Sequence, residues 1–148
     1  MTFIEWTNAM SVHDADMDCE HREIVDLVNK LYLDVRNAQP PQTIERHLAA
    51  LAEIIDSHFV HEEKLMKASS YGRFDEHQRA HASMSHRTAE FLARYRLGEA
   101  AMTMNQVQFI KAWLCTHIQD ADNHFSAHLA GTECSPVRGF CAGHAVRR

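Results

Sequence analysis

Apolar residues recur along most of the chain with the period of an α-helix. Between residues 18 and 37 they return at intervals of three and four and form one stripe: Ile24, Leu27, Val28, Leu31 and Val35. His21 lies on the same stripe, three residues before Ile24. The pattern predicts a first helix from about Asp18 to Asn37, with a histidine on its buried face.

Three further segments carry the same pattern. Pro40 and Pro41 end the first helix and suit the first turn of the second, whose seam alternates steps of four and three: Ile44, Leu48, Leu51, Ile55, His58, Glu62 and Leu65. After a break at 69–72, a third helix begins near Phe74, ends at Gly98 and has one face made of His77, His81, Met84, Thr88, Phe91 and Tyr95. The fourth begins near Thr103 and turns these residues inward: Ile110, Trp113, Leu114, His117, Ile118, Ala121, Phe125 and Leu129.

Four amphipathic helices joined by short links predict an all-α fold, an up-down-up-down four-helix bundle within a domain of residues 1–130. Before about residue 16 the pattern has no clean period, so we expect an extended N-terminal arm laid over the bundle. Residues 131–148 are rich in glycine, cysteine and arginine and lack a hydrophobic period. This composition predicts an irregular, flexible tail.

The composition narrows the function classes. The chain has 148 residues, the size of one domain, and a formal net charge of −5 with both signs interspersed, so no basic run suits a nucleic acid or an anionic bilayer. Neither a signal-like N-terminus nor a membrane-spanning apolar stretch is visible, which predicts a cytoplasmic protein. The four cysteines are too widely spaced for the disulfide framework of a small secreted protein, and we expect reduced thiols.

The most informative feature is a set of ligand-type side chains on the predicted buried stripes. They are His21, His58, Glu62, His77, His81 and His117, together with an aspartate close to His117. Buried carboxylates and imidazoles are costly without partners, and a shared metal would satisfy all of them. Residues four apart lie side by side on one helix face, as His77 and His81 do. Five imidazoles and two carboxylates exceed the ligands of one tetrahedral zinc, so we expect two first-row metal ions bridged by the carboxylates.

These residues resemble the hemerythrin family. The resemblance lies in the following motifs, which occur in this order over about residues 6–129: Asp18-x-x-His21, His58-Phe59-x-x-Glu62-Glu63, His77-x-x-x-His81 and Trp113-Leu114-x-x-His117-Ile118-x-x-x-Asp122. It implies a non-haem centre of two iron ions with an oxo or hydroxo bridge. It also implies that one iron takes His77, His81 and His117, that the other takes His21 and His58, and that Glu62 and Asp122 bridge them. Two departures from the family pattern are His13, where a glycine is common in the arm, and the tail after Leu129.

The bridging aspartate of the fourth helix requires a choice between two residues. Asp122 lies five residues after His117, about 140° around an ideal helix, whereas Asp120 lies three after it, so helix geometry alone favours Asp120. The resemblance favours Asp122, and a π-bulge near Gln119 would bring Asp122 closer to His117. We therefore predict Asp122 as the bridge.

The resemblance implies reversible binding of dioxygen, for storage, delivery or sensing, and no enzymatic activity. The alternative is a di-iron enzyme that handles peroxide or nitric oxide. Oxygen-activating bundles use carboxylate-rich sets with Glu-x-x-His pairs, whereas this set is mostly imidazole with pairs at four, which favours reversible binding. A phosphotransfer bundle would need one exposed histidine and would leave the buried set unexplained. Dioxygen is thus the expected ligand, and any oxygen-consuming or signalling partner protein is unidentified.

Several apolar residues lie within one turn of a predicted ligand. They would be core in any bundle, and they could also wall a dry pocket for a small apolar gas: Ile24, Phe59, Trp113, Leu114 and Ile118.

The remaining polar residues have plainer interpretations. We expect the other histidines in solvent: His13, His47, His61, His86, His124, His128 and His144. His61 could instead support a ligand, and so could Glu63, which is otherwise a surface charge. Cys134, Cys141 and His144 could form a soft metal or redox site, although a tail with free thiols is the favoured interpretation.

Overall fold

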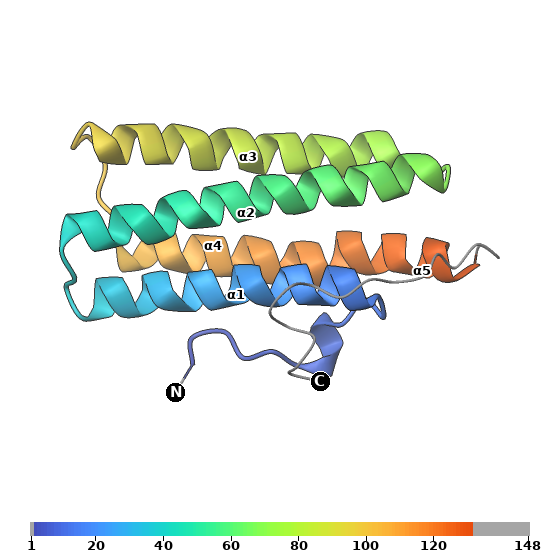
Figure 1. The fold of residues 1–148 in the computed structure, drawn as a ribbon, viewed down its shortest axis with the longest axis horizontal. Helices are drawn as coiled ribbons and strands as arrows, with labels where there is room; N and C mark the ends of the chain where they lie inside the picture. Colours follow the sequence, from blue (N-terminus) through green and yellow to red (C-terminus); the bar gives the residue numbers. More distant parts are fainter. Residues whose placement is uncertain (1, 132–148) are drawn as a thin grey trace.

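The computed structural model describes residues 2–131, which form a bundle of four antiparallel helical rods (Figure 1). The first three rods are α1 (Ala15–Arg36), α2 (Pro41–Ala68) and α3 (Phe74–Arg96). The fourth is continuous and consists of α4 (Met104–His117), a π-helical turn (Ile118–Asp122) and α5 (Asn123–Gly131). The predicted all-α, up-down-up-down four-helix bundle is confirmed. The predicted tail lies outside the described residues, and the division of the chain into 1–130 and 131–148 stays a prediction.

The ends of the rods follow from local sequence. The Asp14 carboxylate caps α1 by accepting hydrogen bonds from the backbone N–H groups of Asp16 and Met17, at 3.0 and 3.1 Å. Thr103 caps α4 in the same way, by accepting from the N–H of Gln106. Gly98 ends α3 in the left-handed conformation, with φ +74°. These caps fix where each rod starts or stops, and therefore at which height its side chains enter the core.

The N-terminal arm is part of the core. It carries one short 3-10 helix, Asn8–Met10, and buries Ile4, Met10 and Val12 against the bundle. The Val12 N–H donates to the Asp18 carboxylate at 2.8 Å, which ties the arm to the first turn of α1. The next residue, His13, has φ 58°, a left-handed conformation that glycine adopts without strain. A histidine is therefore tolerated where the family pattern has a glycine, but at some conformational cost.

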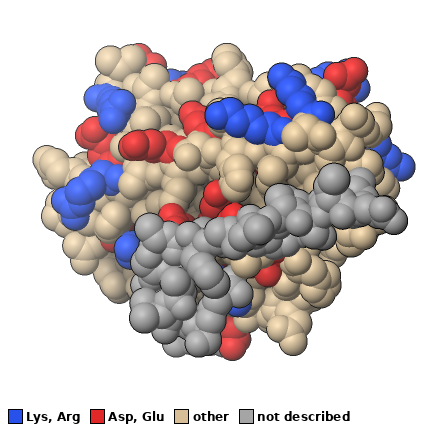
Figure 2. Space-filling view, turned by 45° about the vertical axis from the view of Figure 1, so that its right-hand side comes forward, with Lys and Arg blue, Asp and Glu red and all other residues tan. Residues whose placement is uncertain are grey.

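The core runs along the bundle axis and includes residues from all four rods. Among the described cysteines, Cys115 is a half-buried free thiol, whereas Cys19 is disulfide-bonded, so the expectation of reduced thiols is wrong for Cys19. None of the helices between residues 2 and 131 combines the length and apolar character that a membrane span needs. On the face shown in Figure 2, basic and acidic side chains are interspersed.

Candidate metal centre

All seven predicted ligand residues are buried, and they converge between the rods. The exposed fraction does not exceed 8% for any of them: His21, His58, Glu62, His77, His81, His117 and Asp122. They come from α1, α2, α3 and the fourth rod, so only the assembled bundle brings them together. The inward phase predicted from the stripes is thereby confirmed for each one.

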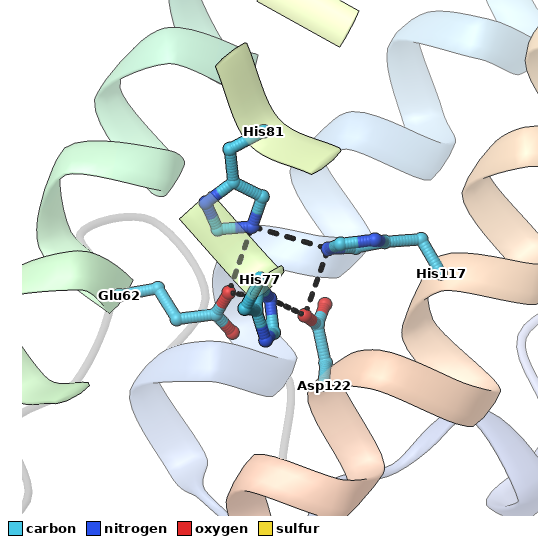
Figure 3. A group of neighbouring side chains, drawn as sticks. All are labelled: Glu62, His77, His81, His117 and Asp122. Carbon is cyan, nitrogen blue, oxygen red and sulfur yellow. Dashed lines mark hydrogen bonds and ion pairs between the residues drawn. The ribbon is translucent and has the colours of Figure 1, made fainter. Parts of the chain in front are cut away.

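Five of these side chains form a first group around one point, as Figure 3 shows. Glu62 reaches into this point from α2, and its Oε1 atom lies 2.8 Å from His77 Nε2 and 3.0 Å from His81 Nε2. Asp122 approaches from the π-helical turn, with Oδ1 3.0 Å from the Nε2 atoms of His77 and His117. The Nε2 atoms of His81 and His117 are 3.1 Å apart. Three imidazoles and two carboxylates thus present one atom each to a common centre.

A second group lies beside the first and shares both of its carboxylates. It consists of His21, His58, Glu62 and Asp122. The Nε2 atoms of His21 and His58 are 3.1 Å apart, and His21 Nε2 lies 2.9 Å from Asp122 Oδ2. Asp122 therefore turns one oxygen to each group. Two adjacent groups of possible metal ligands thus share two carboxylates.

The distances between these atoms are those of ligands around a common cation, although they also lie in the range of hydrogen bonds. Neighbouring ligands of a metal with bonds of about 2.1 Å stand roughly 3 Å apart, which matches the spacings of 2.8–3.1 Å in both groups. Within the described residues, both oxygens of Glu62, both oxygens of Asp122 and His77 Nε2 are fully buried, and their close contacts with the ligand side chains lack regular hydrogen-bond geometry. Buried polar atoms rarely stay unsatisfied. The cluster fits a non-haem metal centre.

The outer nitrogens of two ligands are held by carboxylates. His58 Nδ1 donates to Glu20 at 2.6 Å, and His81 Nδ1 donates to Glu63 at 3.1 Å. Because an ionised carboxylate only accepts hydrogen bonds, each Nδ1 carries a proton, and in the neutral ring Nε2 is the atom with a free lone pair. This tautomer is the one that a metal ion needs, and the carboxylate also fixes the orientation of the ring. Glu63 is therefore a supporting residue, not a plain surface charge.

Glu20 is a functional residue that the sequence analysis missed. One of its oxygens accepts from His58, and the other accepts from His61 Nδ1 at 2.7 Å, so a single carboxylate joins α1 to two histidines of α2. His61 thus takes the supporting role that the sequence left open. The available signal was weak: an acidic residue directly before the predicted ligand His21, on a helix expected to pack beside that of His58.

A π-helical turn decides between the two aspartates. It spans Ile118–Asp122 and widens the fourth rod between His117 and Asp122. Its hydrogen bonds join residues five apart, so Asp122 comes to lie under His117 rather than 140° away. Asp122 is 1% exposed, whereas Asp120 is exposed to solvent. The structure therefore brings Asp122, and not Asp120, to both ligand groups.

Comparison with known proteins agrees with this geometry. The family described as Hemerythrin HHE cation binding domain matches residues 13–129. The chain belongs to the hemerythrin family. It is 28% identical over 131 residues to the bacteriohemerythrin of Methylococcus capsulatus, covering 88% of this chain and 99% of that protein. It is 23% identical over 125 residues to the myohemerythrin of Theromyzon tessulatum, covering 84% of this chain and 92% of that protein.

Solved hemerythrin structures share the fold. A wild-type hemerythrin crystal structure superimposes with a TM-score of 0.83 at 27% identity and covers 87% of this chain and 99% of its own. A hemerythrin variant with one leucine replaced by alanine superimposes with a TM-score of 0.84 at 26% identity and covers 88% of this chain and 100% of its own. The family match over residues 13–129 includes all seven predicted ligand residues.

The carboxylates and imidazoles of this cluster shift one another's pKa values. Burial alone would raise the pKa of the Asp122 carboxyl, but the charge of His117 and the contacts with His21 and His77 hold that pKa well below its usual range. Burial alone would lower the pKa of His77, but contact with Asp122 and Glu62 raises it to about 9. The carboxylates thus stay ionised and attract positive charge, in the form of protons or of metal ions.

Aromatic rings fix two of the ligands from the apolar side. The ring of Phe59 stacks on His81 with centroids 3.8 Å apart, and that of Trp113 stacks on His117 at 4.5 Å. The other three residues of the predicted gas pocket are almost fully buried: Ile24, Leu114 and Ile118. Trp113 itself is half-buried. Two residues of the predicted gas pocket thus lie against ligand rings, and the pocket as a whole stays a prediction.

The expectation that all other histidines are solvated is wrong for His47 and His128, which are half-buried. His47 donates to the buried Asp34 at 2.5 Å, and His128 donates to the Ser69 carbonyl at 2.9 Å. His124 is exposed as expected, and its Nδ1 atom is hydrogen-bonded to the Tyr71 hydroxyl at 2.7 Å. These contacts link rods to each other beyond the ligand cluster. Cys134, Cys141 and His144 lie outside the described residues.

Proposed function

We propose that this hemerythrin-family chain binds dioxygen reversibly at a centre of two iron ions held by His21, His58, Glu62, His77, His81, His117 and Asp122. The observation that carries the proposal is that two buried ligand groups share Glu62 and Asp122. Two iron ions bound there would supply the reversible binding of dioxygen. An oxo or hydroxo group as a further bridge belongs to the same proposal.

The asymmetry of the ligand groups suggests where dioxygen binds. One group has three imidazoles, His77, His81 and His117, whereas the other has only His21 and His58. With the two carboxylates common to both, the second group leaves a coordination position for a small ligand. Ile24 follows His21 by one turn of α1 and is 1% exposed, so this position borders an apolar wall.

The surrounding side chains would keep the site dry and its ligands oriented. Phe59 and Trp113 cover the faces of two imidazoles, and Leu114 and Ile118 are buried next to His117 in the same rod. Dioxygen is small and apolar, so such walls admit it while they disfavour water and protons. Glu20 and Glu63 hold protons on the Nδ1 atoms of His58 and His81 and keep the Nε2 atoms free.

The ligand chemistry favours a carrier over an enzyme. Five of the seven proposed ligands are imidazoles, which bind a metal ion in their neutral form, whereas di-iron bundles that activate oxygen are carboxylate-rich. No second function has a specific observation in its favour, so turnover of peroxide or nitric oxide remains the alternative outcome of the test. We place this carrier in the cytoplasm, with dioxygen as its ligand and any partner protein still to be identified.

The test is a spectroscopic and metal analysis of the full chain. We expect two irons per chain after anaerobic loading with Fe(II), a colour change on exposure to air, and the original spectrum again after oxygen is removed with argon. One zinc per chain, or an irreversible change with steady consumption of added hydrogen peroxide or nitric oxide, would contradict the carrier proposal.

A further inference from the structure

A groove between the C-terminal half of α3 and the N-terminal half of α4 has no part in the proposed function. Its volume is about 460 Å³. Leu48 of α2 and Met84 of α3 lie at its floor, both at most 4% exposed, together with Met102 before α4. Phe91 and Ile110, both half-buried, line its walls. The two helices thus leave an apolar depression open to solvent.

Basic and amide side chains line the rim of this groove. Arg87 and Arg94 are both exposed on α3 and stand seven residues apart, about 10 Å along the helix axis. The Arg87 guanidinium lies over the ring of Phe109, 4.6 Å from its centroid. Arg94 makes only a long contact of 3.5 Å with the Glu99 carbonyl, and neither arginine has a carboxylate partner within residues 2–131. Asn105 and Gln106 line the groove from α4.

The acidic residue of the rim does not neutralise these arginines. Glu90 lines the same groove, but its carboxylate is turned along α3 toward His86, at 3.6 Å. The donors at the Arg94 end, namely its guanidinium and the amides of Asn105 and Gln106, therefore favour an anion. A guanidinium with amide neighbours suits a carboxylate, which it can bind through two parallel hydrogen bonds.

We propose that this groove binds a free fatty-acid anion of medium chain length, with its carboxylate at Arg94 and its chain along Met84 and Phe91. The apolar floor suits an alkyl chain, and the free guanidinium at one end suits the head group. The groove volume falls in the range of small-molecule sites, roughly 300–1,000 Å³.

The binding can be measured by isothermal titration of the full iron-loaded chain with decanoate, decyl glucoside and decyltrimethylammonium. We expect one saturable site for decanoate and at least about tenfold weaker binding of the neutral and cationic amphiphiles, because a hydrogen bond to a charged group is then lost. Arg94→Gln and Asn105→Glu should each weaken decanoate binding by about tenfold or more. Arg46→Gln, an equal loss of charge at an exposed site on α2, should not change it.

Three outcomes would overturn the proposal. The first is the absence of saturable decanoate binding. The second is equal affinity of the Arg94→Gln, Asn105→Glu and Arg46→Gln chains, which would mean that decanoate binds elsewhere. The third is recruitment to phosphatidylglycerol vesicles that depends on Arg94 while free decanoate does not bind, which would assign the groove to a membrane surface. None of these results depends on dioxygen binding, so the proposed function and this site can fail separately.

Discussion

Replacement of Asp122 by asparagine tests the central feature of the proposed site, a carboxylate shared by both ligand groups. Its Oδ1 atom lies 3.0 Å from His77 and His117, and its Oδ2 atom lies 2.9 Å from His21. The substitution preserves size and packing but removes the charge. Loss of a residue that merely supports a metal ligand already weakens metal binding by about 10- to 100-fold. Loss of a shared ligand should weaken the binding of each metal ion by at least about 100-fold, or about 3 kcal/mol.

The matched control is Asp120→Asn, which changes an exposed aspartate of the same π-helical turn. Both variants would be loaded with Fe(II) under anaerobic conditions, passed through a desalting column and challenged with a graded series of chelators. We expect the Asp120 variant to retain two irons per chain and the Asp122 variant to release both ions at much lower chelator concentration. If the Asp122 variant keeps its iron and the Asp120 variant loses it, the assignment of the bridge is refuted.

Three further predictions concern the pocket, the stability and the proton balance. The Leu114→Ala substitution should lower the free energy of unfolding by about 2–5 kcal/mol. The oxygenated Leu114→Ala chain should also autoxidise faster than the Leu31→Ala chain, which carries a comparably buried core change on α1. Equal autoxidation rates in stopped-flow spectroscopy would mean that Leu114 is an ordinary core residue. Removal of iron should lower the unfolding temperature in calorimetry, because metal that binds only the folded chain stabilises it; unchanged melting would argue against a metal in the core. Since the pKa of His77 in the metal-free chain is raised to about 9, this residue is protonated at pH 7 and must release its proton on metal binding. Calorimetric titrations of the metal-free chain with Fe(II), in buffers of different ionisation enthalpy, should detect at least one proton released per chain. The affinity of the chain for iron should rise with pH up to about 9. If no proton is released, His77 is not protonated in the metal-free chain.

The rods of the bundle could be predicted from sequence because each depends on local signals. The apolar stripe predicted the first helix over 18–37, and α1 spans Ala15–Arg36, its start moved upstream by the Asp14 cap. Pro41 and the break at 69–72 bracket α2 as expected. Binary pattern, proline and capping residues act within one turn, so they are visible without tertiary contacts.

The partners in the supporting contacts could not be predicted, because they depend on how the rods are rotated against each other. Glu20 lies directly before His21 in sequence, yet it bonds to two histidines of α2 that are 38 and 41 residues away. The same holds for His124, which meets Tyr71 across 53 residues. A helical wheel gives the face of a residue but not its partner, and each such partner is set by packing over the whole bundle.

The π-helical turn shows how the metal centre and the backbone depend on each other. An α-helical fourth rod would turn Asp122 about 140° from His117, so that only one of them could face the cluster. The wider turn at Ile118–Asp122 brings both to the same point, at 3.0 Å. A π turn has poorer backbone geometry than an α turn and tends to persist at functional sites. Here the reason is specific: Asp122 is the one residue of the fourth rod that reaches both ligand groups, and without the turn neither group would have its second carboxylate.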